Sequence, residues 1–143
     1  MKKTRYLMLI PLICILLLAS FFAYRHFHPY KLSELTNFRS DEIPVSVSVQ
    51  YMDTYDGTVV MTNKDEIIKL IELLTERSYR FTTEPPMPGN NRYITLLYGD
   101  GTEVSFGAGM IKAKNGGYSP DARDGVDSLL GNWAAASGTV SRR

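Results

Sequence analysis

The residue types that most often perform catalysis are almost absent after the first thirty positions of this chain. The single cysteine, Cys14, lies in a hydrophobic run, and both histidines, His26 and His28, follow that run directly. Ser-His-Asp and Cys-His mechanisms need one of these side chains beside the substrate, and zinc sites use the same donors. We therefore expect a folded part that is not an enzyme and holds no cofactor or metal.

Carboxylates are the remaining candidates for chemistry. Glycosidase-type catalysis needs only a pair of Asp or Glu side chains, and Glu84, Asp100 and Glu103 lie in or near expected loops. Glu84 borders a proline-rich segment, while Asp100 and Glu103 bracket a Gly-Asp-Gly turn, so solvated turn carboxylates are the better interpretation. Two Asp-rich stretches, 53–57 and 121–127, lack the ligand spacing of a calcium loop and favour turns and helix capping.

The charge distribution argues against nucleic acid. All 15 acidic residues lie at or after Glu34, whereas Lys2, Lys3, Arg5 and Arg25 precede it. The remaining 12 of the 16 basic residues leave the rest of the chain with a net charge of −3. A nucleic-acid-binding domain needs a basic surface, so we expect neither DNA nor RNA as a partner.

The N-terminal segment has the features of a membrane anchor. A basic start is followed by 17 uncharged residues, Leu7 to Ala23, which as a helix measure about 25 Å, close to the hydrocarbon thickness. We predict an uncleaved anchor over residues 1–24, oriented by its basic start with the N-terminus in the cytoplasm. Its expected membrane-facing residues are Leu7, Leu12, Leu16, Phe21 and Phe22.

A cleaved signal peptide is the alternative to an anchor, with cuts after Ala19 or Ala23. The run is longer than a usual signal core, and bulky aromatic residues crowd both sites, so we favour the anchor. Lipidation of Cys14 is disfavoured because Ile13 precedes it. The aromatic and polar residues 24–30 are typical of an interfacial collar, which we favour over a metal site at His26 and His28.

After an expected stalk over residues 25–42, the pattern predicts one α+β domain over 43–136. Val45, Val47 and Val49 alternate with polar residues as in a strand with one buried face, and a turn leads into a second strand at 58–61. Asn63 and Glu66 have the spacing of a helix cap, followed by KDEIIKLIELLTER with one apolar stripe. This run is the clearest helix in the sequence.

Further strands are expected at 78–82, 93–98, 103–106 and 110–114, with a hairpin turn at 99–102 and a short return from Tyr118. Ser119-Pro120-Asp121 has the order of a helix start, and the spacing of Val126, Leu129 and Trp133 predicts a closing helix. The fold expected is a mainly antiparallel sheet with the long amphipathic helix and the C-terminal helix packed on it, in the order β-β-α-β-β-β-α. Residues 137–143 are expected to form a frayed tail.

The domain has more aromatic residues than one helix face can cover, which suggests an exposed binding surface beside the EPPMPGNN segment. We predict that Glu84, Pro85, Pro86, Met87, Tyr93 and Tyr98 form it. Such a surface suits a protein, peptide or glycan partner in the cell envelope. The alternative is that the helix containing Trp133 covers this face. Lys112 and Lys114, on one face of a strand, could also meet an anionic partner, or simply discourage aggregation at a sheet edge.

The succession of an anchor, the VSVSV strand, the capped helix NKDEIIKLIELLTER, a proline-rich loop and ITLLYGDGTEVSF resembles small exported or membrane-anchored proteins of Gram-positive bacteria. Those families are described only as domains of unknown function. The resemblance covers residues 43–133 and implies no catalytic residue. The function we expect is a membrane-anchored, extracytoplasmic, non-catalytic binding or sensory module, or alternatively an inhibitor or immunity-type protein acting on an envelope enzyme or toxin.

Overall fold

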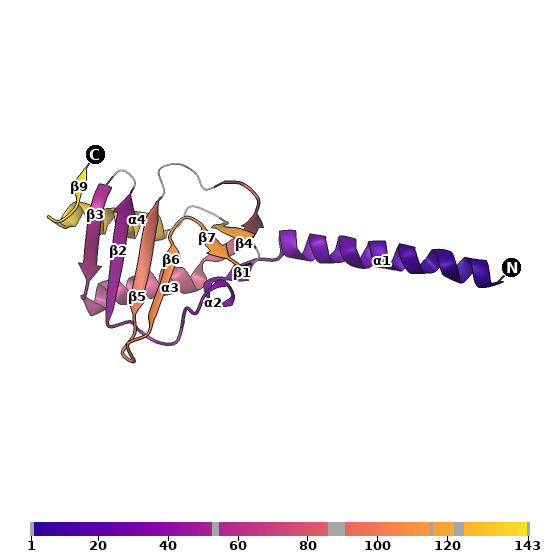
Figure 1. The fold of residues 1–143 in the computed structure, drawn as a ribbon. Helices are drawn as coiled ribbons and strands as arrows, with labels where there is room; N and C mark the ends of the chain where they lie inside the picture. Colours follow the sequence, from indigo (N-terminus) through magenta and orange to yellow (C-terminus); the bar gives the residue numbers. More distant parts are fainter. Residues whose placement is uncertain (1, 53–54, 86–90, 115, 122–124, 143) are drawn as a thin grey trace.

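The computed structural model describes residues 2–52, 55–85, 91–114, 116–121 and 125–142 of the 143-residue chain. It has an α+β fold with antiparallel sheets, from which one long N-terminal helix projects (Figure 1). The expected fold class is therefore confirmed. The expected single sheet is instead divided into a five-stranded and a four-stranded sheet.

Helix α1, Lys2–Phe27, extends away from the rest of the molecule (Figure 1). Its segment Leu9–Phe27 has 19 residues with a mean hydropathy of 1.8, and none of it is buried. The predicted anchor residues Leu12, Leu16, Phe21 and Phe22 all have exposed side chains. The helix is thus long and apolar enough to cross a membrane or to act as a signal sequence.

The five-stranded sheet, called the large sheet below, has the order β6-β5-β2-β3-β9. Its strands are β2 Ser46–Met52, β3 Tyr55–Met61, β5 Arg92–Leu97, β6 Glu103–Gly107 and β9 Ser141–Arg142. Both predicted hairpins, β2–β3 and β5–β6, are present. The prediction of a frayed tail is wrong for Ser141–Arg142, because these residues pair with Tyr55 and Asp56 of β3.

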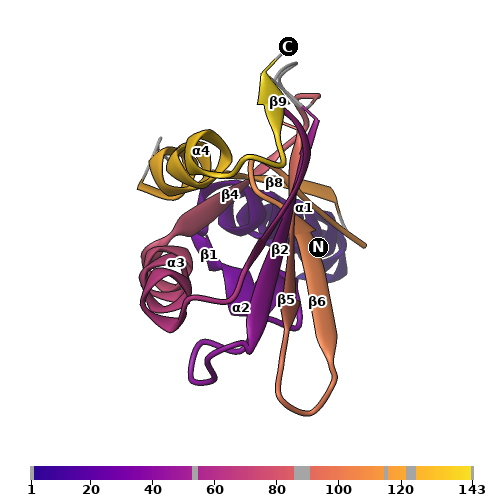
Figure 2. The ribbon, with the colours of Figure 1, turned by 90° about the vertical axis from the view of Figure 1, so that its left-hand side faces the viewer.

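Two helices cover one face of the large sheet, α3 Lys64–Glu76 and α4 Gly125–Ala136 (Figure 2). Alternation along the strands places the inner side chains Val47, Val49 and Tyr51 completely out of solvent. The helices meet where the Trp133 indole N–H donates to Glu66 Oε2 at 2.9 Å. Since both helices lie on the same side, the opposite face is uncovered among the described residues, and Tyr93 and Val60 are exposed on it.

Helix α3 begins where the sequence predicts. Asn63 is the N-cap, and its side-chain oxygen accepts from the amides of Asp65 and Glu66 at 3.0 and 3.3 Å. By contrast, the helix start predicted at Ser119-Pro120 is wrong. Both residues lie in strand β8, where Pro120 pairs with Tyr79 and Ser119 with Arg80, and α4 begins at Gly125.

The four-stranded sheet, called the small sheet below, has the order β1-β4-β8-β7. Its strands are β1 Tyr30–Lys31, β4 Ser78–Thr82, β7 Ile111–Ala113 and β8 Gly116–Pro120, and a short helix, α2 Leu32–Leu35, follows β1. The prediction of a stalk over residues 25–42 is therefore wrong. Leu32 and Phe38 are buried in the core, and β1 pairs with β4, so this segment is part of the fold.

Candidate functional site

A groove lies where the large sheet meets the small sheet, and it contains several of the sequence-predicted binding residues. Its volume is about 640 Å³, and Glu84, Pro85 and Tyr93 are among the residues that line it. Strand β5 supplies Tyr93 from the uncovered face of the large sheet, and the chain leaving β4 supplies Glu84 and Pro85. The structure thus brings together three residues that the sequence singled out.

The remaining predicted residues of this surface are Tyr98, Pro86 and Met87. Tyr98 is buried, with 1% of its surface accessible, so its assignment to an exposed surface is wrong. It follows the end of β5, where its phenol oxygen accepts a hydrogen bond from the amide of Arg39 at 3.1 Å. Pro86 and Met87 lie outside the described residues.

The walls of the groove come from strands on both sides of the junction. Tyr93, Ser105 and Phe106 line it from the large sheet, and Thr82, Lys112 and Ser119 line it from the small sheet. In the large sheet, Tyr93 pairs with Gly107 of β6, and in the small sheet Lys112 pairs with Gly117 of β8. At Gly107 a Cβ atom would overlap the carbonyl oxygen of Met110, so glycine there allows the two backbones to approach closely.

The charges in the groove are partly neutralised. Arg92 lies 3.8 Å from the Asp127 carboxylate and donates to the Asp127 carbonyl at 3.3 Å, while Arg80 forms an ion pair with Asp121. Glu84 and Lys112 form no ion pair within the described part of the chain. The groove therefore presents one carboxylate, one ammonium group and the exposed ring of Tyr93 to a ligand.

The Arg92–Asp127 pair was not predicted from the sequence. The two residues are 35 positions apart, and no local pattern connects them. Lys112 was noticed as part of a lysine pair on a strand, but its place in the groove depends on β7 pairing with β8. Sequence periodicity predicts that the segment containing Lys112 is a strand, but it does not predict which strand pairs with it.

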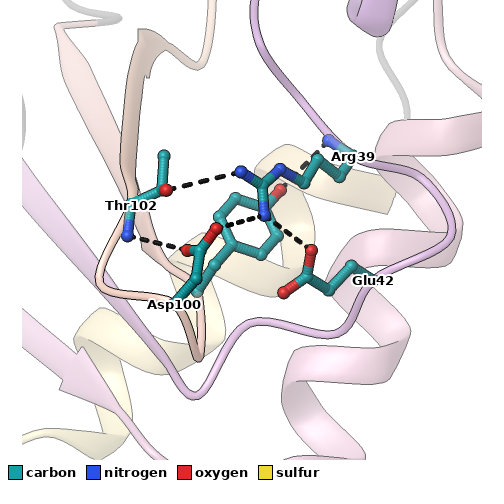
Figure 3. Close-up of polar contacts among 5 residues, drawn as sticks. Arg39, Glu42, Asp100 and Thr102 are labelled. Atoms are coloured by element: carbon teal, nitrogen blue, oxygen red, sulfur yellow. Dashed lines mark hydrogen bonds and ion pairs between the residues drawn. The ribbon is translucent and has the colours of Figure 1, made fainter.

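A second polar cluster holds the β5–β6 turn against the segment after α2 (Figure 3). The Arg39 guanidinium donates to Glu42 at 2.7 Å, to Asp100 at 2.9 Å and to the Thr102 hydroxyl at 3.3 Å. It also lies 4.9 Å from the centre of the Tyr98 ring. The cluster is formed by side chains that satisfy one another, so we interpret it as a structural clamp.

Hydrogen bonds in this clamp fix the charge of Asp100. The amide of Thr102 donates to Asp100 Oδ1 at 2.9 Å, and this bond, with those of the Thr102 side chain and Arg39, lowers the pKa of Asp100 to about 2. The carboxylates of Glu42 and Asp100 in turn raise the pKa of Arg39. A carboxyl group held so firmly ionised is poorly suited to donate a proton as a general acid.

Of the three carboxylates considered for glycosidase-type chemistry, Glu84 lies apart from Asp100 and Glu103. Glu84 lines the groove, near the end of β5 where Tyr93 pairs with Gly107. Glu103 pairs with Leu97 at the other end of the hairpin, beside the turn that contains Asp100. Four residues of strand separate Tyr93 from Leu97, or about 13 Å, which exceeds the spacing of a catalytic carboxylate pair.

Asp53 and Asp124, one in each Asp-rich stretch, lie outside the described residues. Within the part of the chain that the structure describes, no three His, Cys, Asp or Glu side chains are grouped as metal ligands. Comparison of the chain with protein-family models, with curated proteins and with solved structures gives no match.

Proposed function

We propose that this protein is a membrane-anchored binding module that receives a peptide segment of a partner protein in the groove between its two sheets. Helix α1 is the anchor, retained after export, and the domain faces the extracytoplasmic side. The observation that carries the proposal is the convergence of Tyr93, Glu84 and Lys112 on one groove of about 640 Å³.

The chemistry of the groove favours a peptide. An exposed aromatic ring offers a large apolar contact with few rotatable bonds, and such residues dominate the energetics of protein interfaces. The carboxylate of Glu84 and the ammonium group of Lys112, neither of which forms an ion pair with another described residue, complement a ligand that bears charges of both signs, as a peptide does. A purely anionic ligand would be repelled by Glu84, which lines the groove and forms no ion pair among the described residues.

The experiment is photo-crosslinking on whole cells from a reactive residue placed at Ser105, which lines the groove and is exposed. We expect a covalent adduct of defined mass that contains a peptide of a partner protein. Tyr93→Ala and Lys112→Ala should each lower its yield by about fivefold or more. A yield that is unchanged in both variants would refute the proposal.

Val60 provides the matched control position for the crosslinker. It is 63% exposed and lies on the same uncovered face, in the row formed by Val60, Ser48, Thr95 and Ser105. Three strand spacings, about 14 Å, separate it from Ser105. The same adduct from both positions would mean that the partner covers the whole face, as expected for the alternative function of an inhibitor or immunity-type protein.

A further inference from the structure

The small sheet is attached directly to the end of α1. Only His28 and Pro29 separate the last residue of α1 from the first residue of β1. The Arg25 guanidinium lies 4.2 Å from the centre of the Phe81 ring on β4, and the Tyr30 ring lies 5.0 Å from that of Tyr118 on β8. These contacts hold the small sheet at the end of the helix, so an inserted α1 keeps it at the membrane surface.

Charge in the small sheet is entirely of one sign. Its four strands contain Lys31, Arg80 and Lys112 and no Asp or Glu, and Lys114 follows β7 directly. Large-sheet strands, by comparison, contain two acidic and two basic residues, Asp56, Arg92, Glu103 and Arg142. The strands of the small sheet are thus basic, whereas Glu34, Glu84 and Asp121 follow the ends of three of them.

Two of these cations are already engaged, and two are not. Lys31 Nζ donates to the carbonyls of Thr75 and Glu76 at 3.4 and 2.9 Å, at the C-terminal end of α3, and Arg80 pairs with Asp121. Lys112 and Lys114 are exposed and form no ion pair among the residues that the structure describes. They are therefore the cations of this sheet that can meet an external anion.

The position of these two lysines relative to α1 follows from the strand register. They flank Ala113, which pairs with Gly116 of β8. A Cβ atom at Gly116 would lie 3.3 Å from the Arg25 guanidinium, in the last turn of α1. One strand spacing, about 5 Å, thus separates Ala113 from Gly116, and alternation along β7 places the side chains of Lys112 and Lys114 on the face opposite Arg25.

We propose that Lys112 and Lys114 form a surface that binds the anionic headgroups of the lipids around α1. This inference rests on the anchoring part of the proposed function. Lys112 also lines the groove, whereas Lys114 does not, so Lys114 separates the two proposals. The attraction between an exposed lysine and a headgroup extends over a screening length of about 8 Å at physiological salt. Each lysine near an anionic membrane contributes roughly 1 kcal/mol, which corresponds to about a fivefold effect.

The test uses the full chain reconstituted in vesicles of phosphatidylcholine alone or of an equal mixture with phosphatidylglycerol. The measured quantity is the acetylation rate of each lysine by a water-soluble reagent, followed by mass spectrometry. We expect the rates at Lys112 and Lys114 to fall about fivefold in the anionic vesicles and to recover in high salt. The exposed Lys64 at the start of α3 is the internal reference, and its rate should be the same in both vesicles.

A second measurement separates lipid contact from a change in folding. Hydrogen exchange of the β7 amides should be slower in the anionic vesicles for the native chain and for Lys64→Gln, and equal in both vesicles for Lys112→Gln/Lys114→Gln. Equal acetylation rates in both vesicles, with the chain floating with the lipid, would overturn the headgroup contact alone. A chain that fails to float with either vesicle would overturn the anchor and, with it, this inference.

Discussion

The large and small sheets are built from different kinds of contact. The large sheet grows mostly from two hairpins, β2–β3 and β5–β6, whose strands are close in sequence. Its inner face, formed by residues such as Val49, Ile94 and Leu96, is completely buried against two helices. Local pairing and a covered apolar face give this sheet the features of an independently stable unit.

Outside its β7–β8 hairpin, the small sheet joins segments that are far apart. Tyr30 of β1 pairs with Tyr79 of β4, and Phe81 of β4 pairs with Tyr118 of β8. Its rings contact one another and the end of α1, and it forms one wall of the groove. The difference indicates a division of roles, in which the large sheet provides most of the stability and the small sheet connects the anchor to the binding site.

The largest effect is expected from a cavity under the large sheet. Leu70→Ala removes a completely buried side chain of α3 and should lower the free energy of unfolding by about 2–5 kcal/mol. Urea unfolding of the full chain in detergent would measure this. Ile68→Ala, at a partly buried position of the same helix, is the control and should cost clearly less. Equal losses at both positions would mean that α3 does not pack as described.

The next effect tests the small sheet. Gly116 has φ of 141°, and a Cβ atom there would lie 2.4 Å from Cε2 of Phe81. Gly116→Ala should therefore cost roughly 1–3 kcal/mol and speed hydrogen exchange in β7 and β8 without affecting β2. Exchange that rises equally in both sheets would contradict the division of roles.

Gly131→Ala is the matched control for this substitution. Gly131 lies in α4, and a Cβ atom there would meet nothing within 4 Å. Because alanine favours a helix over glycine by about 1 kcal/mol, this variant should be unchanged or slightly more stable. A loss of stability at Gly131 similar to that at Gly116 would indicate a general intolerance of substitution and not a specific contact with Phe81.

The same division explains which parts of the structure the sequence could predict. The α3 cap, its apolar stripe and both hairpins depend on residues within a few positions of one another, so their patterns are visible in the chain. The small sheet depends on β1, which has two residues and pairs with a strand almost fifty positions later. No local periodicity marks such a strand, so the sequence pattern predicts a stalk in its place.

The candidate site was predictable to the same limited degree. Exposure of Tyr93 and its closeness to Glu84 and Pro85 follow from strand alternation beside a proline-rich loop. Tyr98 was assigned wrongly because its environment depends on Arg39, 59 positions earlier in the chain. The Arg92–Asp127 contact is equally non-local. The sequence predicts residues whose exposure depends on alternation within one strand. It does not predict residues whose environment depends on tertiary contacts.

A smaller effect is expected at the cap of α3. Asn63→Ala removes the acceptor for the amides of Asp65 and Glu66 and should lower the free energy of unfolding by about 1 kcal/mol. Asn63→Asp keeps an acceptor oxygen at the helix start and should be close to the native chain. The loss should be confined to α3 in hydrogen exchange. A loss in Asn63→Asp as large as in Asn63→Ala would show that the cap bond is not its cause.

The smallest effect concerns the clamp between the β5–β6 turn and the segment after α2. Hydrogen bonds from Thr102 and Arg39 hold the pKa of Asp100 at about 2 in the folded chain, below its ordinary value of 3.8. A depressed carboxyl pKa stabilises the folded state above the unfolded pKa, and this contribution is lost as the pH falls from about 4 to about 2. Asp100→Asn removes the titrating group and should therefore be less stable than the native chain at neutral pH, by a small amount because the site is exposed to solvent.

Thermal unfolding of Asp100→Asn and the native chain at several pH values would measure this contribution. We expect the difference in midpoint to be constant from neutral pH to about 5 and to shrink toward zero near pH 2. Glu103→Gln is the control, because Glu103 is exposed on the same hairpin and lies outside the clamp. The contrary result is that the unfolding midpoints of Asp100→Asn and the native chain differ by the same amount at pH 5 and at pH 2. That result would mean that the charge of Asp100 does not stabilise the turn. The large sheet would then have no electrostatic link through Asp100 to the segment after α2.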